Sequence, residues 1–208
     1  VQTVRDKLSV LKEYFGHDSF REGQDRITDS LLGGRDVLGI MPTGAGKSIC
    51  YQVPALMFDG ITIVVSPLIS LMKDQVSALV QSGVAAAYIN SSLTHAQYLK
   101  VLQNTESGKY KIIYVAPERL CAPAFLGICR NLNISMVAVD EAHCVSQWGQ
   151  DFRPSYLKIP DFIDTLNSRP VVGAFTATAT GAVRNDIKTL LRLVSPLVVT
   201  TGFDRPNL

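Results

Sequence analysis

Short apolar segments rich in β-branched residues recur along the chain. They span residues 36–40, 61–66, 85–90, 111–116, 134–140, 171–176 and 196–200. Each is apolar throughout instead of alternating apolar with polar positions, which is typical of strands that are buried on both faces. The pattern therefore predicts a central sheet of about seven strands with a layer of structure on each side.

Segments of helical period separate several of these strands. Residues 68–83, 95–108 and 182–193 carry apolar side chains at helical spacing. Gly83, Gly108 and the pair at 33–34 stand where helices would end. This alternation predicts an α/β fold with a mostly parallel sheet and helices on both faces. The chain of 208 residues has room for one such domain, which we expect to span residues 1–208.

Four polar motifs follow predicted strands. They are PTGAGKS at 42–48, SPLISL at 66–71, DEAH at 140–143 and TATAT at 176–180. In open parallel sheets, ligands bind at the carboxyl ends of the strands. The four motifs are therefore expected to lie at the ligand-binding edge.

The first motif has the composition of a phosphate-binding loop. Its glycines let the backbone turn its N–H groups inward, and the helix that follows adds its positive end. Lys47 would reach the β- and γ-phosphates of a nucleotide, and the Ser48 hydroxyl would ligate Mg²⁺. Met41 replaces the first glycine of the strict pattern G-x-x-x-x-G-K-[ST]. The predicted loop residues are Thr43, Gly44, Ala45, Gly46, Lys47 and Ser48.

The DEAH motif places two carboxylates directly after an apolar strand. Asp140 would hold Mg²⁺ through its water shell, beside Ser48. Glu141 would orient and polarise the attacking water as general base. His143 is at most a coupling residue. We therefore predict Glu141, Asp140 and Lys47 as the catalytic residues.

Composition excludes some classes of protein and leaves others open. The net charge of +2 does not by itself indicate nucleic-acid binding. No apolar run approaches the roughly 20 residues of a membrane span, and the N-terminus lacks the apolar core of a signal peptide. The four cysteines form no C-x-x-C pair, so they predict buried reduced thiols in an intracellular protein and no zinc site. The chain begins with Val1, so we expect a piece of a longer protein.

Taken in order, the motifs resemble those of RecQ-family DNA helicases, a branch of superfamily 2. The resemblance covers nearly the whole chain, and DEAH running into SQWGQDFRPSY is its most specific part. The matching segments are 15–24, 41–48, 66–75, 114–120, 140–156, 175–180 and 203–208. The resemblance implies the first RecA-like P-loop NTPase domain of an ATP-dependent 3′–5′ DNA helicase. Such an enzyme uses ATP and Mg²⁺ to move along single-stranded DNA in DNA repair and recombination, and acts on branched DNA.

The same resemblance assigns further residues. Arg21 and Gln24 of FREGQ would recognise adenine, and His17 stands where the family has an aromatic residue that stacks on the base. Ser66, Ser70 and Lys73 are candidate contacts to the backbone of single-stranded DNA. An amphipathic helix also needs a polar face, so this alternative stays open for the last three residues.

The segment at 146–153 resembles the family's aromatic-rich loop, which links DNA binding to ATP hydrolysis. Its candidate residues are Gln147, Trp148, Phe152 and Arg153, and Gln150 replaces a histidine that the family often has. The aromatic side chains would stack on unpaired bases, or else form a buried cluster. Thr176 and Thr178 would relay the nucleotide state to DNA, or else cap the following helix.

The resemblance also indicates what the chain lacks. The segment at 203–208 resembles the entry to a second RecA-like lobe, whose arginines would reach the γ-phosphate, and zinc-binding and winged-helix modules would lie further on. We therefore expect the isolated lobe to be nearly inactive. An RNA helicase of the DEAH or DEAD type and a non-catalytic ATP-dependent switch or adaptor are the alternatives. The expected location is intracellular, cytoplasmic in a bacterium and nuclear in a eukaryote, without membrane association.

Overall fold

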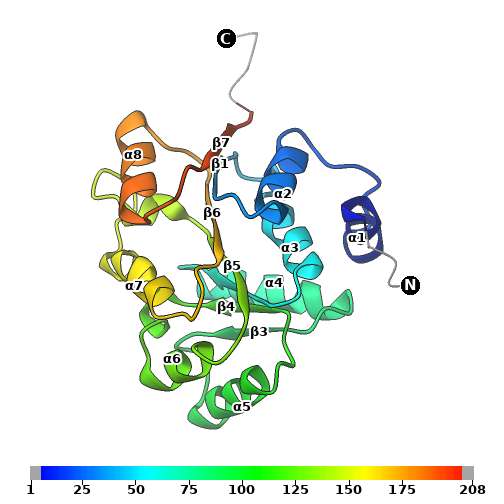
Figure 1. Ribbon diagram of the computed structural model, residues 1–208, viewed down its shortest axis with the longest axis vertical. Helices are drawn as coiled ribbons and strands as arrows, with labels where there is room; N and C mark the ends of the chain where they lie inside the picture. The colour runs from blue at the N-terminus through cyan, green and yellow to red at the C-terminus, as the bar shows by residue number, and fades with distance from the viewer. Residues whose placement is uncertain (1–5, 203–208) are drawn as a thin grey trace.

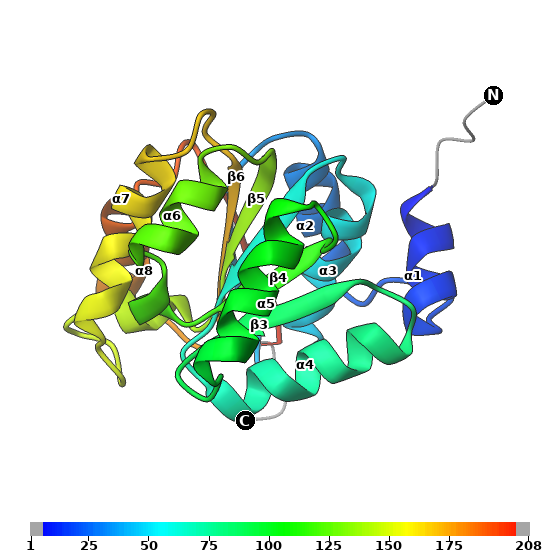
Figure 2. The ribbon, with the colours of Figure 1, turned by 90° about the horizontal axis from the view of Figure 1, so that it is seen from below.

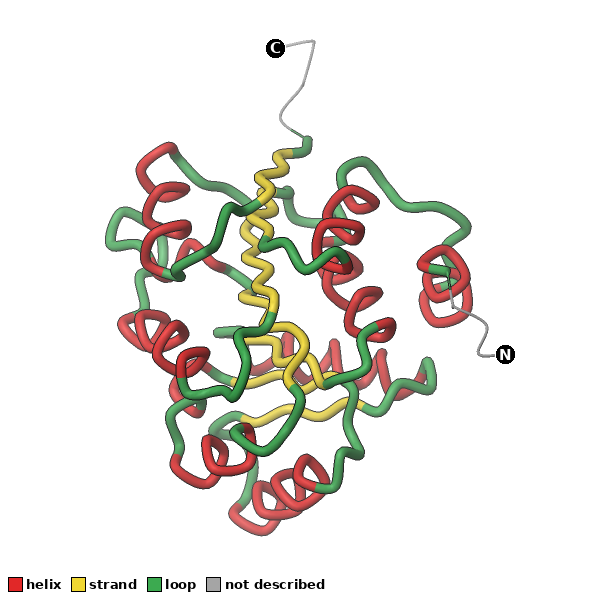
Figure 3. The backbone as a smooth tube through the Cα atoms, viewed as in Figure 1, coloured by secondary structure: helices red, strands yellow, loops and turns green. Residues whose placement is uncertain are grey.

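A seven-stranded sheet forms the centre of the computed structural model, which describes residues 6–202 (Figure 3). Its strand order is β3-β4-β2-β5-β6-β1-β7, and each neighbouring pair is parallel. The strands are β1 (Val37–Ile40), β2 (Ile61–Val65), β3 (Ala86–Ile89), β4 (Ile112–Val115), β5 (Ile134–Val139), β6 (Val171–Thr176) and β7 (Leu197–Thr200). All seven predicted strands and the parallel α/β class are thereby confirmed. The segment at 203–208 lies outside the described residues.

Helices cover both faces of the sheet (Figures 1 and 2). On one face pack α2 (Gln24–Leu32), α3 (Lys47–Met57) and α4 (Ile69–Gln81), and α1 (Lys7–Phe15) packs against α3. On the other face pack α5 (His95–Glu106), α6 (Pro123–Cys129), α7 (Ile159–Asp164) and α8 (Gly181–Leu190). Three short 3₁₀ segments complete the described elements: η1 (Pro117–Arg119), η2 (Ala142–Val145) and η3 (Pro154–Lys158).

The three predicted helices are present, and the glycine signals end helices as expected. Gly34, Gly83 and Gly108 adopt the left-handed backbone conformation two residues after the last residue of α2, α4 and α5. Glycine takes this conformation without steric cost, which lets the chain leave the helix and enter the next segment.

The strands are buried because both layers of helices pack apolar side chains onto them. Five of the seven strands, β1, β2, β4, β5 and β6, have nearly every residue buried. Cys50, Cys129 and Cys144 are buried thiols, and Cys121 is half-buried. Within residues 6–202, no helix combines the length and the apolar character needed to cross a bilayer.

The strand order determines which motifs meet. Strand β6 pairs with β1 on one side and with β5 on the other. The phosphate-binding loop, the TATAT segment and the DEAH motif therefore follow three adjacent strands at the same edge of the sheet. The SPLISL segment follows β2, which pairs with β5 on the side of β5 that faces away from β6.

Candidate functional site

The phosphate-binding loop joins β1 to α3 through two residues in the left-handed conformation. Gly44 has φ 84° and Gly46, at the N-terminus of α3, has φ 80°. The loop carbonyls are held by side chains: Arg21 Nη1 donates to Gly44 O at 2.7 Å, and Lys47 Nζ donates to Met41 O at 3.2 Å. These two hydrogen bonds hold the backbone at the start and in the middle of the segment between β1 and α3.

Gln24 makes two hydrogen bonds to the backbone of this loop. Its Nε2 donates to Ala45 O at 3.2 Å and to Gly46 O at 3.1 Å, while its Oε1 accepts from the Arg21 N–H at 2.8 Å. A Cβ at Gly46 would lie 2.4 Å from Gln24 Nε2, so this contact requires glycine. Because both N–H groups of the amide are engaged, Gln24 can donate to a base only after it releases a loop carbonyl.

Two adjoining pockets surround the loop. The first, of about 290 Å³, brings the loop and the acidic pair together; its lining residues are Thr43, Gly44, Gly46, Lys47, Ser48, Tyr51, Leu71, Gln75, Asp140 and Glu141. The second, of about 310 Å³, holds the three residues assigned to adenine; it is lined by Phe15, His17, Ser19, Arg21, Gln24, Gly46, Ser48, Ile49 and Gln52. Gly46 and Ser48 line both. The predicted nucleotide residues thus converge on one region, although Ala45 lines neither pocket.

Asp140 and Glu141 differ in burial and in backbone conformation. Asp140 is 6% exposed, and burial, with the neighbouring Glu141 carboxylate, raises its pKa to about 6. The Glu141 N–H, which donates to Asp140 Oδ1 at 3.0 Å, and Lys47 act in the opposite direction. Glu141 itself takes the left-handed conformation, with φ 48° and ψ 47°, and is half-buried. A non-glycine residue in this conformation is uncommon and turns the chain sharply at the strand end.

A chain of polar contacts joins the acidic pair to the TATAT segment. His143 Nδ1 lies 3.3 Å from Glu141 Oε2 and 2.9 Å from Thr176 Oγ1. The Thr176 hydroxyl donates to Thr178 O at 3.1 Å, so it accepts from Nδ1–H of His143. Thr180, not Thr176 or Thr178, caps α8, because its Oγ1 accepts from the Val183 N–H. Thr176 therefore contacts the histidine of DEAH and neither of its carboxylates.

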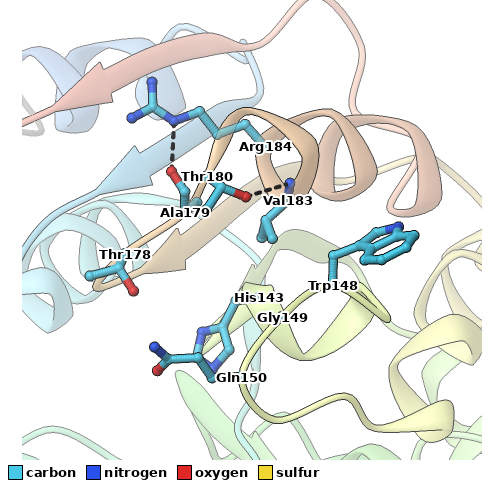
Figure 4. Close-up of a pocket in the computed structure, with 9 residues that line it drawn as sticks. All are labelled: His143, Trp148, Gly149, Gln150, Thr178, Ala179, Thr180, Val183 and Arg184. Atoms are coloured by element: carbon cyan, nitrogen blue, oxygen red, sulfur yellow. Dashed lines mark hydrogen bonds between the residues drawn. The ribbon is translucent and has the colours of Figure 1, made fainter.

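Trp148 stands out from the surface of the aromatic-rich loop, 79% exposed. Figure 4 shows its ring beside the start of α8. Trp148 helps to line a pocket of about 360 Å³ between this loop and that helix. Gln147 is also exposed and Phe152 is half-buried. A buried aromatic cluster therefore does not describe Trp148.

Several contacts anchor the aromatic-rich loop to the surrounding motifs. Ser146 Oγ donates to Asp186 Oδ2 of α8 at 2.6 Å, and the Trp148 N–H donates to Ser146 Oγ at 3.1 Å. Arg153 Nη1 donates to Pro67 O at 3.2 Å, beside an ion pair with Asp151. The loop is thereby tied both to α8 and to the segment before α4.

The backbone of the acidic pair has an anchor of its own. The buried hydroxyl of Tyr156 donates to Asp140 O at 2.8 Å. Sequence reasoning missed Ser146, Tyr156 and Asp186, because their partners are 16 to 40 residues away along the chain.

The three candidates on the SPLISL segment separate by exposure. Ser66 is 1% exposed, and its hydroxyl has no hydrogen-bond partner among the described residues. Ser70 and Lys73 lie in the first turns of α4 and are exposed. Of the three, only Ser70 and Lys73 present side chains to solvent.

Comparison with known proteins identifies the family. A model described as "DEAD/DEAH box helicase" matches residues 21–187. This chain belongs to the DEAD/DEAH box helicase family. Within that family, the resemblance to RecQ helicases is confirmed. The chain is 50% identical over 201 residues to the ATP-dependent DNA helicase RecQ of Bacillus subtilis and 48% identical to that of Pasteurella multocida, covering 96% and 97% of this chain.

The chain spans about a third of these relatives, 34% and 32% of their lengths. It is also 44% identical to the ATP-dependent helicase wrn-1 of Caenorhabditis elegans, of which it covers 19%. Among solved structures, the DUF1998 helicase MrfA bound to DNA matches 97% of this chain with a TM-score of 0.76 at 16% identity, over 30% of its own chain. A hypothetical ATP-dependent RNA helicase from Sulfolobus tokodaii matches 93% with a TM-score of 0.71 at 20% identity, over 56% of its own chain. These two structures confirm the RecA-like helicase fold.

Proposed function

We propose that this chain is the ATP-binding lobe of a RecQ-type, ATP-dependent 3′–5′ DNA helicase. The observation that carries the proposal is the single pocket that joins Lys47 and Ser48 of the phosphate-binding loop to Asp140 and Glu141. Sequence identity to the RecQ proteins supports the choice of DNA over RNA and a role in DNA repair and recombination. Action on DNA also supports an intracellular location, cytoplasmic in a bacterium and nuclear in a eukaryote.

The residues around this pocket suit a nucleoside triphosphate and a magnesium ion. Lys47 would supply the positive charge for the phosphate oxygens, and the backbone N–H groups around Gly44 and Gly46, at the N-terminus of α3, would bind them. The Ser48 hydroxyl and the Asp140 carboxylate are hard oxygen donors that line the same pocket, which fits Mg²⁺. When bound, the ion would neutralise charge that develops on the phosphates.

Glu141 would accept a proton from the attacking water. Its contact with His143 orients the carboxylate, and Thr176 fixes the histidine in turn. His17, Arg21 and Gln24 would bind the adenine, with Gln24 exchanging the loop carbonyls for the base edge. Nucleotide binding and proton transfer from water are thus both assigned to residues of this lobe.

Single-stranded DNA would bind across the motifs at the same sheet edge. Ser70 and Lys73 would contact phosphates, and Trp148 with Phe152 would stack on unpaired bases. Gln147 and Arg153 would support that loop, and Thr178 would join it to the TATAT segment. Ser66 would act only after a rearrangement, since it is buried.

An arginine from a second RecA-like lobe would complete the site, so we expect the isolated chain to bind Mg²⁺–ATP and single-stranded DNA weakly and to turn over little. Steady-state ATP hydrolysis, measured on this chain and on the longer protein with and without DNA, tests this. Strong DNA-stimulated turnover by the isolated chain would disprove the need for a second lobe.

Two alternatives give different outcomes in the same assay. An RNA helicase would be stimulated by RNA more than by DNA of the same sequence. A non-catalytic switch or adaptor would bind a partner in the presence of ATP, and the longer protein would show no turnover. The pairing of Glu141 with His143 favours an enzyme, because a switch does not need an oriented general base.

A further inference from the structure

Gln75 ends the segment at 66–75, but no role was assigned to it from the sequence, and in the structure it lines the pocket that joins the phosphate-binding loop to the acidic pair. It lies on α4, is half-buried, and lines the pocket together with Lys47, Ser48 and the acidic pair. Leu71 lines the same pocket from one turn earlier on the helix. Residues four apart share a helix face, so this face of α4 forms one wall of the pocket.

The orientation of the Gln75 amide follows from its buried neighbour Gln52. Gln52 is 4% exposed, and its Nε2 donates to Gln75 Oε1 at 2.8 Å and to the Tyr114 hydroxyl at 2.9 Å. Both N–H bonds of Gln52 are thereby used. With Gln52 in this orientation, the atom of Gln75 that meets it is the oxygen.

The other half of the Gln75 amide is a donor without a partner. Its Nε2 makes no hydrogen bond to any residue between 6 and 202. This N–H group is not enclosed by protein atoms, so it is open to a group that enters the pocket, and a pocket that also contains Lys47 and Ser48 is suited to an anion. A phosphate oxygen is an acceptor that Gln75 Nε2 could bind there.

We propose that Gln75 binds the terminal phosphate of a nucleoside triphosphate through its side-chain amide. This inference rests on the proposed function and extends it, because it adds a residue that distinguishes triphosphate from diphosphate. The terminal phosphate is the one expected nearest Asp140 and Glu141, which line the pocket with Gln75. Since Gln75 belongs to α4, the nucleotide then contacts directly the helix that carries Ser70 and Lys73.

The test compares a fluorescent non-hydrolysable ATP analogue with the corresponding ADP derivative, both with Mg²⁺, by titration into the 208-residue chain. Gln75→Met keeps the length of the side chain and removes the donor. It should weaken binding of the ATP analogue about tenfold, the expected loss for a hydrogen bond to a charged group, and leave ADP binding nearly unchanged. Gln75→Glu keeps the acceptor for Gln52 but brings a negative charge to the phosphates, so it should weaken the ATP analogue further.

The controls separate this inference from the proposed function. Gln81→Met changes an exposed glutamine of the same helix, outside the pocket, and should leave both affinities unchanged. If the chain binds both nucleotides, and both Gln75 variants keep its preference for the ATP analogue, Gln75 does not bind the terminal phosphate. If the unchanged chain fails to bind either nucleotide, the proposed function falls and this inference with it. Thermal unfolding of each variant shows whether it is folded. If Gln75→Met does not fold, the result with Gln75→Glu decides whether Gln75 binds the terminal phosphate.

Discussion

His143 Nδ1 lies 2.9 Å from the Thr176 hydroxyl, which joins the DEAH motif after β5 to the TATAT segment after β6. The same nitrogen is 3.3 Å from Glu141 Oε2. A threonine from the neighbouring strand therefore holds the imidazole against the candidate general base. Thr176 is buried, so water has little access to its hydroxyl.

Replacing Thr176 should impair hydrolysis more than binding. Thr176→Val preserves the shape of the side chain but removes the hydroxyl that fixes His143, so in the longer protein we expect kcat for DNA-stimulated ATP hydrolysis to fall about tenfold. Nucleotide affinity should stay within about twofold. Thr176→Ser retains the hydroxyl and should retain most of the rate. A valine variant with normal kcat would show that the contact has no part in hydrolysis.

Lys47 and Glu141 should separate binding from chemistry. Lys47→Ala removes the cation of the phosphate-binding loop, so titration with a fluorescent ATP analogue should show loss of binding. Glu141→Gln keeps a side chain of the same size without the base, so binding should persist while hydrolysis falls by about 10² or more. Equal loss of binding in both variants would contradict these roles.

Asp140 should make stability depend on pH. Its pKa is raised from 3.8 to about 6, so the folded chain holds a proton that the unfolded chain has already released between these values. Stability therefore falls as the pH rises from about 4 to about 6, and the full cost is present above pH 6. Its size is on the order of 2–3 kcal/mol.

Asp140→Asn removes this titration. Relative to the unchanged chain, the variant should gain stability between pH 4 and pH 7.5, as measured by urea unfolding at both values. The measurement compares the stability difference between the variant and the unchanged chain at pH 4 with the same difference at pH 7.5. Any packing cost of the substitution that does not depend on pH cancels in this comparison. An identical difference at both pH values would show that Asp140 does not titrate in this range.

Trp148 should contribute to DNA binding and not to folding. The side chain is 79% exposed, so Trp148→Ala should leave the unfolding midpoint unchanged. Loss of one stacked base costs roughly 1–3 kcal/mol, so affinity for single-stranded DNA should fall by about fivefold to 150-fold. Fluorescence anisotropy with a labelled oligonucleotide measures this affinity. An unchanged affinity would show that Trp148 does not contact DNA.

The anchor beneath Trp148 can be tested separately. Ser146 Oγ donates to Asp186 and accepts from the Trp148 N–H. Ser146→Ala should therefore reduce DNA stimulation of hydrolysis while Mg²⁺–ATP binding is retained, and Ser146→Thr, which keeps the hydroxyl, should restore part of it. If Ser146→Ala shows full stimulation, the anchor does not determine the position of the loop.

Periodicity predicted the strands and the sheet type, and motif order predicted that the glycine-rich loop and the acidic pair lie at the same edge of the sheet. This succeeded because strands buried on both faces need continuous apolar runs, and the loop and acidic motifs have few other uses at strand ends. Helix α1 and the short α6 and α7 were not predicted. The last two have seven and six residues and begin at or next to proline, too short for a periodic signal.

Contacts between distant residues could not be predicted from the sequence. Nothing near Gln24 indicates that its amide holds the carbonyls of Ala45 and Gly46, and nothing near Gln75 indicates its bond to Gln52. The exposure of Trp148 was equally hidden, since an indole beside a phenylalanine is as common in a core as on a surface. Such features depend on which elements the fold brings together.

Strand β6 lies between β1 and β5, so its width separates the phosphate-binding loop from the acidic pair in the pocket that they share. Neighbouring strands lie about 4.8 Å apart, so the ends of β1 and β5 are held roughly 10 Å from each other. The packing of Phe175 over Gly39 and Gly173, where a Cβ would approach its ring to within 2.9 Å and 2.8 Å, keeps these strands in close register. Substitutions in the part of β6 before Thr176 would therefore alter catalysis by changing a distance and not a functional group.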